Sequence, residues 1–449
     1  MLADKLTLKD LEIFRASDEN ISLFDLLDRT ITAGGKFNLE HRFRNPLKDI
    51  NQILTVQEAV LLISHDERRW KLPFSDRIMK SLENYISSNI DPVTGSAKLD
   101  ICITGIKYFI SERNIFYYLK ESIVEVFEYV NLLKTYLNIL SSEKQDGLIK
   151  IFEDRVHSFT DLTAFKEVSA IISSKRKLSF TDVFYYDGLL RSEFKNSLRN
   201  VIDIAYDLDA LVSMAKVSAE LGLCRPDIVD DDTFKLDIRG LYHLALKNPV
   251  PNSVSISEGK NILFVTGPNM AGKTTFLRSI GIAVFLSHIG MCVPAKSMKV
   301  SYYDRLITGL TVTDSILSGY SFFFSEVRRV KEVAEALCNQ ERVFAIFDEL
   351  FKGTNVKDAY DSSEMIISGF SHWGKNMFII SSHLAELYTD IKNYDSISYC
   401  YFESEVKDGI PGFSYHLSEG VSDARLGTII IRNEKIPDLL NKKNKHDSD

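Results

Sequence analysis

Two stretches in the first half of the chain place an apolar residue at every third or fourth position. Steps of four and three residues are the period of an α-helix with one apolar face. One stretch runs from Leu119 to Leu140 and the other from Phe194 to Ala219. We expect two long helices that pack side by side as antiparallel levers, with the residues between them forming the tip. Such seams can also join two chains in a coiled coil, but packing within one core is the simpler interpretation.

Almost the whole chain before about residue 246 is expected to be helical, and its character changes there. Beyond that point, short runs rich in β-branched and aromatic residues alternate with helical stretches, which predicts a sheet with helices on its faces. Residues 262–266, 343–347 and 376–381 are expected to be buried strands. The pattern predicts a multidomain α and α/β protein. We expect a long-helix core and lever domain over residues 1–245, an α/β domain over residues 246–436 and a disordered polar tail over residues 437–449.

The composition is that of an ordinary globular protein, with 449 residues, 45% hydrophobic residues and a formal net charge of -8. The acidic balance argues against a protein that coats nucleic acid through bulk charge, although a local basic patch can still contact DNA. The five cysteines lack the spacing of a metal or redox motif, which indicates free thiols in a reducing compartment. No signal peptide or membrane-spanning apolar run is present in the sequence, so we expect a cytoplasmic protein without a membrane partner.

The strand at residues 262–266 leads into a loop with the spacing of the Walker A motif, Gly267-x-x-x-x-Gly272-Lys273-Thr274. Glycines let the backbone turn its N–H groups toward phosphate oxygens, and the N-terminus of the following helix adds the positive end of its dipole. Lys273 is expected to reach the β and γ phosphates and Thr274 to bind Mg²⁺. The expected nucleotide-binding residues of this loop are Gly267, Pro268, Asn269, Met270, Ala271, Gly272, Lys273, Thr274 and Thr275.

Two later strands end in side chains that would complete an ATP site. Residues 343–347 precede Asp348 and Glu349, which read as Walker B followed by a glutamate. Asp348 is expected to bind Mg²⁺ and Glu349 to polarise the attacking water. The strand at residues 376–381 leads to His383, which is placed to sense the γ phosphate. Ligands gather at the carboxyl ends of the strands in such a sheet. The expected ligands are therefore ATP and Mg²⁺, and the expected catalytic residues are Glu349, His383 and Lys273.

A small-residue turn before a helix is a second candidate anion site. It contains Leu317-Ser318-Gly319-Tyr320-Ser321, and the helical pattern continues to Leu337. ABC-type ATPases present such a turn to the γ phosphate held by a partner subunit. We therefore expect Gly319 and Ser321 to act in trans, and the active form to be a dimer. Tyr320 stands where the transporter signature has its second glycine.

These motifs together resemble those of the MutS mismatch-repair family. Thr266 to Thr275 is similar to that family's Walker A motif, in which Pro-Asn-Met is distinctive. Gly319-x-Ser321-x-Phe323-x-x-Glu326 resembles its signature loop, and Asp348 to Asn355 resembles its loop after Walker B. Val250-Pro251-Asn252 is similar to the segment on the nucleotide-base side, which adds Asn252 to the expected nucleotide-binding residues. The resemblance extends upstream through Ser22 to Thr30, Thr32 to Gly35, Arg44 to Leu47 and Ala205 to Leu211.

The resemblance implies an ABC-type ATPase that hydrolyses ATP with Mg²⁺ and couples nucleotide state to movement of helical arms. It implies action on DNA in mismatch repair or a related transaction, as a homodimer or a MutS-like heterodimer. The chain begins where the family's core domain begins, so we do not expect the family's mismatch-reading and connector modules. A DNA contact is left to Lys175, Arg176 and Lys177, the densest basic run before the C-terminal tail, although such runs are more often solvated loops.

Three other classes of protein remain open from the residues alone. An ABC-type switch ATPase could act on a protein or ribosome partner without recognising mismatched DNA. A chromosome-organising ABC ATPase with a coiled-coil arm would need far longer heptad runs. A P-loop kinase is disfavoured because Walker B is followed by Glu349 and joined by a strand-end histidine, His383.

Overall fold

The computed structural model describes residues 1–15, 21–93, 106, 112–141, 147–174, 176–231, 233–256, 258–311, 322–383, 387–407, 410–421 and 433–442. The chain groups into two compact units. A helical unit consists of Leu27–Arg42 and Thr55–Leu221, and a sheet unit consists of Met1–Leu26, Phe43–Leu54 and Gly222–Asp449. This grouping assigns two N-terminal segments to the later half of the chain. The limits 1–245, 246–436 and 437–449 stay a prediction of domain extent.

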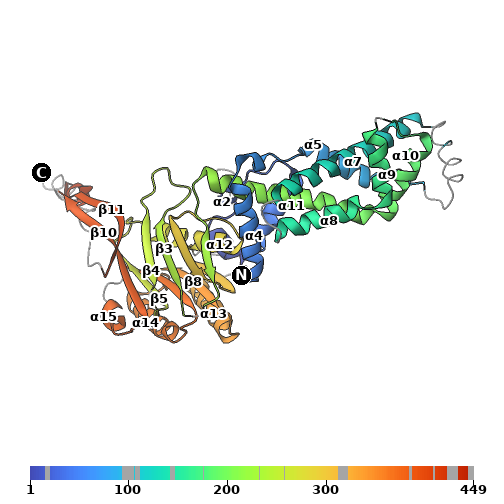
Figure 1. Ribbon diagram of the computed structural model, residues 1–449. Helices are drawn as coiled ribbons and strands as arrows, with labels where there is room; N and C mark the ends of the chain where they lie inside the picture. Colours follow the sequence, from blue (N-terminus) through green and yellow to red (C-terminus); the bar gives the residue numbers. More distant parts are fainter. Residues whose placement is uncertain are drawn as a thin grey trace. The chain divides into compact units, whose positions relative to one another are not determined.

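The helical unit contains both helices expected from the apolar stripes, α7 (Arg113–Ser141) and α11 (Lys195–Glu220) (Figure 1). The two helices touch where the Tyr129 hydroxyl of α7 donates a hydrogen bond to the Val201 carbonyl of α11 over 3.2 Å. The stripe residues Leu119, Ile123, Val126 and Val130 are buried, as a helix with one apolar face requires. Helix α7 packs mainly against α5 (Asp76–Ile86), α8 (Leu148–Thr160) and α10 (Phe180–Gly188).

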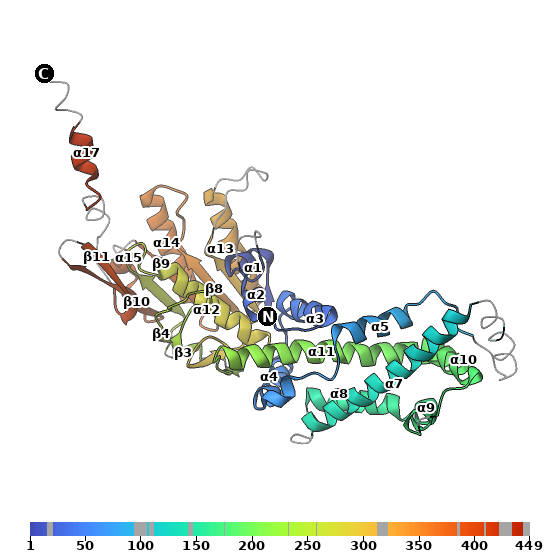
Figure 2. The same cartoon turned by 90° about the horizontal axis from the view of Figure 1, so that it is seen from above.

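The residues between the two long helices do more than form a tip, which differs from the expectation. They fold as α8 (Leu148–Thr160), α9 (Thr163–Ser173), α10 (Phe180–Gly188) and a π-helical turn (Leu189–Glu193) that leads into α11. Helix α8 packs back along both α7 and α11 (Figure 2). The physical reason is that α8 has an apolar face of its own, with Ile149, Phe152 and Val156 buried at helical spacing. The unit is therefore a bundle. Its other helical segments are α3 (Ala33–Arg44) as far as Arg42, α4 (Ile50–Ser64) from Thr55 onward, the 3₁₀ turn Glu67–Trp70 and α5 (Asp76–Ile86).

The upstream motifs pack α3 against α11. The buried Asp209 carboxylate of α11 accepts hydrogen bonds from Thr32 N at 2.8 Å and Thr32 Oγ1 at 2.6 Å, at the start of α3. A Cβ atom at Gly34 would lie 2.5 Å from the Tyr206 ring, and one at Gly35 would lie 2.1 Å from Asp209 Oδ2. Two glycines are needed there because the two helices approach too closely for side chains.

The sheet unit is built on two sheets. Among the described residues, the larger sheet has the strand order β1-β7-β8-β9-β5-β10-β11, parallel except for β11. Its strands are β1 (Leu2–Ala3), β5 (Ile262–Thr266), β7 (Arg305–Gly309), β8 (Val343–Asp348), β9 (Met377–Ser382), β10 (Ile397–Lys407) and β11 (Ile410–Glu419). The smaller mixed sheet has the order β2-β6-β3-β4, with β2 (Pro226–Val229), β3 (Leu236–Leu241), β4 (Asn252–Ile256) and β6 (Ser297–Ser301). The first 245 residues are therefore not as uniformly helical as expected, since β1, β2 and β3 lie there.

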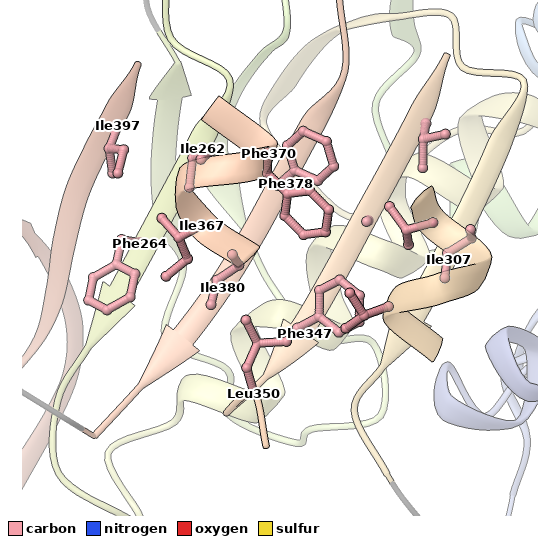
Figure 3. Packing of buried hydrophobic residues seen from close by; sticks show 14 of the residues in the cluster. Ile262, Phe264, Ile307, Phe347, Leu350, Ile367, Phe370, Phe378, Ile380 and Ile397 are labelled. Atoms are coloured by element: carbon pink, nitrogen blue, oxygen red, sulfur yellow. The ribbon is translucent and has the colours of Figure 1, made fainter. Parts of the chain in front are cut away.

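Helices cover both faces of the larger sheet. The helices of the sheet unit are α1 (Lys5–Asp10), α2 (Leu23–Leu27), α12 (Lys273–His288), α13 (Phe322–Cys338), α14 (Val356–Ser371), α15 (Leu387–Ile391) and α17 (Ile436–Lys442). One face packs against α13, α14 and α15, where the rings of Phe370 and Phe378 stack with centroids 4.2 Å apart (Figure 3). Burying each such side chain contributes about 1.5–3 kcal/mol. The other face packs against α12, in which a Cβ atom at Gly281 would lie 3.2 Å from Ile346 Cδ1 of β8.

The long helices of the bundle are amphipathic and carry charged residues on their exposed faces. Within the described residues, no helix combines the length and the apolar content needed to cross a membrane.

Candidate functional site

The three strands that carry the Walker-type residues are neighbours in the larger sheet, in the order β8-β9-β5. All three run parallel, and their ends are in register, with Asp348 opposite Ser381 and Thr266 opposite Ser382. The loop after β5, the acidic pair at the end of β8 and the residues after β9 therefore meet at one edge of the sheet. This is the edge at which open α/β sheets bind their ligands.

The loop after β5 has the backbone geometry that its glycines allow. Gly267 has a φ of 141° and Gly272 a φ of 103°, and Gly272 is the N-cap of α12. Lys273 begins the helix, and its ammonium group donates to the carbonyl oxygens of Gly267 at 2.7 Å and Pro268 at 3.2 Å. Burial lowers the pKa of Lys273, and the carboxylates of Glu349 and Asp348 oppose this effect. A positive side chain is thus held at a helix N-terminus, where an anion would bind.

The Asp348 carboxylate lies against two hydroxyl groups. Thr274 Oγ1 of α12 donates to Asp348 Oδ2 over 2.5 Å, and the Ser381 hydroxyl of β9 donates to the other carboxylate oxygen. Asp348 ends β8 and Thr274 lies in the first turn of α12, so a buried carboxylate and a hydroxyl form an all-oxygen donor set beside the Walker-type loop. Such a set fits Mg²⁺, which prefers oxygen ligands and keeps several waters when it is bound with a nucleotide.

Glu349 lies among three basic side chains. Its Oε2 atom is 3.3 Å from His383 Nδ1 and 3.5 Å from Lys352 Nζ, and its Oε1 atom is 3.9 Å from Lys273 Nζ. The hydrogen bond from His383 is the largest influence, and with the nearby lysines it lowers the pKa of Glu349 to about 2. The same hydrogen bond raises the pKa of His383. Glu349 and His383 thus form a pair beside the Walker-type loop, in which each residue favours the charged form of the other.

A cavity of about 720 Å³ lies over these residues. Its floor is the Walker-type loop with Asp348, Glu349 and Lys352, and its walls come from the β3–β4 connection and from β11. The wall residues include Tyr242, His243, Leu246, Pro249 and Tyr415. A cavity of this size, with apolar and aromatic walls and a few polar groups at one end, has the character of a small-molecule site.

Asn252, which the family resemblance implies to be a nucleotide-binding residue, lines this cavity. Its side-chain amide donates to the Tyr415 carbonyl at 3.0 Å and accepts from the Leu417 N–H at 2.8 Å. The amide of Asn252 therefore links β4 to β11 through two hydrogen bonds. A contact between Asn252 and a nucleotide base stays a prediction.

The structure brings together residues of the Walker A loop, Asp348, Glu349 and His383. It does not describe Gly319, Ser321 or Lys175, so the predicted site in trans and part of the basic run lie outside the described residues. Arg176 and Lys177 are exposed in the connection between α9 and α10. The functional roles of all these residues stay predictions.

Sequence reasoning assigned no role to three side chains of the site, although Glu326 and Lys352 lie within the motifs described above. Lys352 lies within 4 Å of both Walker B carboxylates, Ser381 hydrogen-bonds Asp348, and Glu326 of α13 hydrogen-bonds the backbone after Glu349. Ser381 could have been found, because it is the last residue of a predicted strand that neighbours Walker B. Lys352 could not, because its direction depends on the left-handed backbone of Glu349 and Phe351, each with a φ of 61°.

The fold and the site define a mixed α/β protein with a Walker-type loop at the carboxyl edge of a largely parallel sheet. Comparison with known families identifies it more closely. Residues 6–215 match MutS domain III and residues 263–448 match MutS domain V. The two matches span both halves of the chain, and the chain belongs to the MutS family.

Curated relatives agree with this membership. The chain is 25% identical to the DNA mismatch repair protein MutS of Persephonella marina, over 97% of this chain and 59% of that protein. It is 30% identical to the DNA mismatch repair protein MSH6 of Arabidopsis thaliana, over 55% of this chain and 20% of that protein. It is 28% identical to the MutS protein of Bacillus licheniformis, over 56% of this chain and 29% of that protein. The matched part thus spans between 20% and 59% of the length of these relatives.

Proposed function

We propose that the chain is an ATPase of the ABC and MutS type, which binds ATP with Mg²⁺ in the cavity and hydrolyses it. The observation that carries the proposal is the convergence of Lys273, Thr274, Asp348, Glu349 and His383 at one edge of the sheet. A lysine at the phosphate-binding loop, oxygen ligands for Mg²⁺ and a residue that positions the attacking water are recurring parts of phosphoryl-transfer sites.

Each side chain has a distinct part in the proposed reaction. Lys273 exchanges its carbonyl partners for phosphate oxygens, and the backbone N–H groups of the loop bind the remaining oxygens. Thr274 and Asp348 would hold Mg²⁺, which supplies neutralisation of the phosphate charge. Glu349, ionised and oriented by His383, aligns and polarises the attacking water. His383, whose Nδ1 atom lies 3.3 Å from Glu349 Oε2, would sense the γ phosphate.

We further propose that nucleotide state moves the helical arms and that the chain acts on DNA as a dimer, either of itself or with a MutS-like partner. The support is family membership and relatives that are named as DNA mismatch repair proteins. Recognition of mismatches is not part of the proposal, because the two family matches are to domains III and V.

The test separates binding from turnover. Lys273→Ala should weaken ATP binding at least about tenfold, because it removes the charge-assisted contacts to phosphate. Glu349→Gln should keep ATP affinity and lower steady-state phosphate release by about 10²–10⁴-fold, because only water activation is lost. Lys331→Ala and Glu335→Gln are matched controls, because they make the same kinds of change at exposed positions of α13. The side chains of Lys331 and Glu335 are 70% and 61% exposed and form an ion pair over 3.5 Å. Normal turnover by Glu349→Gln would show that the water activator is misassigned, and a wild-type protein that binds no ATP would overturn the proposal.

A further inference from the structure

Glu326 in the first turns of α13 is a buried carboxylate that points at the Walker B loop. Only 6% of its surface is exposed. One carboxylate oxygen accepts from the Lys352 N–H at 3.1 Å, and the other accepts from the Gly353 N–H at 3.2 Å. Burying a carboxylate costs free energy unless hydrogen bonds compensate it, so the two N–H groups are needed to keep Glu326 buried at this place. Burial raises the pKa of Glu326 and the two N–H donors oppose that effect.

The loop that Glu326 contacts has an unfavourable backbone. Glu349 and Phe351 both have a φ of 61°, a left-handed conformation that bulky residues rarely adopt. Conformations of this kind persist only where surrounding contacts impose them, and they cluster at functional sites. Phe351 is one anchor, because it is buried with its ring centroid 5.8 Å from that of Phe323 in α13. Glu326 is the other anchor, since it fixes the two N–H groups that follow.

Helix α13 is itself firmly attached, so it can impose this conformation. The buried Arg329, one turn after Glu326, donates to the Thr308 carbonyl of β7 at 2.6 Å and to Thr7 Oγ1 of α1 at 2.6 Å. It also pairs with the Asp4 carboxylate. The start of α13 is thus joined to strand β7 and helix α1 on one side and to the Walker B loop on the other.

We propose that Glu326 is a positioning residue for hydrolysis, which holds residues 349–353 so that the Glu349 carboxylate stays beside Lys273 and His383. The inference rests on the proposed ATPase function. Glu326 does not line the cavity of about 720 Å³ above the Walker-type loop. Its effect on the reaction must therefore pass through the loop and through Glu349.

Glu326→Gln is the test variant, because it keeps the size of the side chain but turns an NH₂ group toward an N–H donor. Turnover should fall by about 10- to 100-fold, which is the usual effect of misplacing a catalytic group by about 1 Å. The affinity for ATP should change by less than about twofold, because the phosphate-binding loop keeps all its contacts. Glu335→Gln, on the exposed side of the same helix, should leave both quantities unchanged.

A double-mutant cycle distinguishes positioning from a general loss of structure. If Glu326 acts through Glu349, adding Glu326→Gln to Glu349→Gln should cause no further fall in turnover, whereas independent effects would multiply. Full additivity in the cycle, or an equal loss of ATP affinity and turnover, would overturn the inference. So would normal turnover by a folded Glu326→Gln protein.

A second variant covers the case in which Glu326→Gln does not fold, as judged by its thermal transition. Phe323→Leu weakens the apolar contact between α13 and Phe351 of the Walker B loop. Like Glu326→Gln, it should lower turnover while the affinity for ATP is kept. Normal turnover by folded Phe323→Leu would then overturn the inference. If Glu349→Gln abolishes turnover but Glu326→Gln and Phe323→Leu leave it normal, only this inference fails. If Glu349→Gln turns over normally, the proposed water activator fails and the inference falls with it.

Discussion

At the scale of single residues, the setting of Glu349 defines what it can do. Its pKa of about 2 means that it is ionised throughout the ordinary pH range and is a weak acceptor for a full proton. An ionised carboxylate fixed by neighbouring cations is better suited to orienting and polarising water than to carrying a free proton. The same electrostatic contact makes His383 more basic, so the two residues titrate as a pair.

This pairing predicts a measurable shift of the histidine. The pKa of His383 should lie above its ordinary value of 6.5, and Glu349→Gln should bring it back toward that value. The contribution of the pair to stability is fully present between the ordinary pKa values of 4.5 for Glu349 and 6.5 for His383. It is lost as pH rises through the raised pKa of His383 or falls toward the pKa of Glu349, about 2. An NMR titration of the imidazole protons measures both values. Glu335→Gln is the control, and a His383 pKa that ignores Glu349→Gln would contradict the pairing.

At the scale of elements, the sequence predicts what local patterns determine. The strands expected at 262–266, 343–347 and 376–381 became β5, β8 and β9, because each is a continuous apolar run bounded by turn residues or charges. The lever helices α7 and α11 followed from period alone.

Elements whose stability depends on distant partners were missed. Strand β1 has two residues and pairs with β7 in the register Leu2 with Arg305, so nothing nearby in the sequence marks it. The apolar face of α8 is visible in the sequence, but its packing onto α7 and α11 depends on tertiary contacts. In the site, the strand-end residues were predictable, whereas Lys352 and Glu326 were not, since both contacts require the left-handed turn after β8.

The contact between α3 and α11 leads to a stability prediction. Gly35→Ala should destabilise the protein by about 1–3 kcal/mol, because the new Cβ atom would overlap the buried Asp209 carboxylate. Gly369→Ala in α14 is the matched control, since nothing lies within 4 Å of the Cβ position there and alanine is the better helix former. Chemical denaturation of both variants tests this. Equal stability of Gly35→Ala and wild type would show that the two helices do not pack as closely as described.

At the scale of the whole molecule, the proposed dimer makes the two halves of each ATP site separable. Ser321→Arg should bind ATP through its intact phosphate-binding loop yet be inactive alone, because the predicted contact in trans is lost. Mixing it with Lys273→Ala should restore activity, since one of the two sites in the heterodimer then receives neither change. Phosphate release after mixing measures this. No recovery, with heterodimers demonstrated by mass, would argue against a shared site.

The possible contact with DNA also belongs to this scale, and its strength follows from charge. The chain has a formal net charge of -8, and the candidate contact is the short run Lys175, Arg176 and Lys177, of which the latter two are exposed. Lysine and arginine contacts of this kind go to phosphates, which carry no sequence information. We therefore expect modest binding to duplex or branched DNA at low salt, with little preference for a mismatch.

Replacing Lys175, Arg176 and Lys177 together with alanine should flatten the salt dependence of DNA binding and leave basal ATPase activity intact. Neutralising about three phosphates gives a slope of log affinity against log salt near -3, so losing these contacts should remove most of it. Replacing Lys331 alone, an exposed lysine of the sheet unit, is the control and should leave the slope unchanged. Filter binding to homoduplex, mismatched and branched DNA over a range of salt measures the slope and the preference together. Tight, mismatch-selective binding that survives the triple replacement would mean that a different surface of the protein reads DNA.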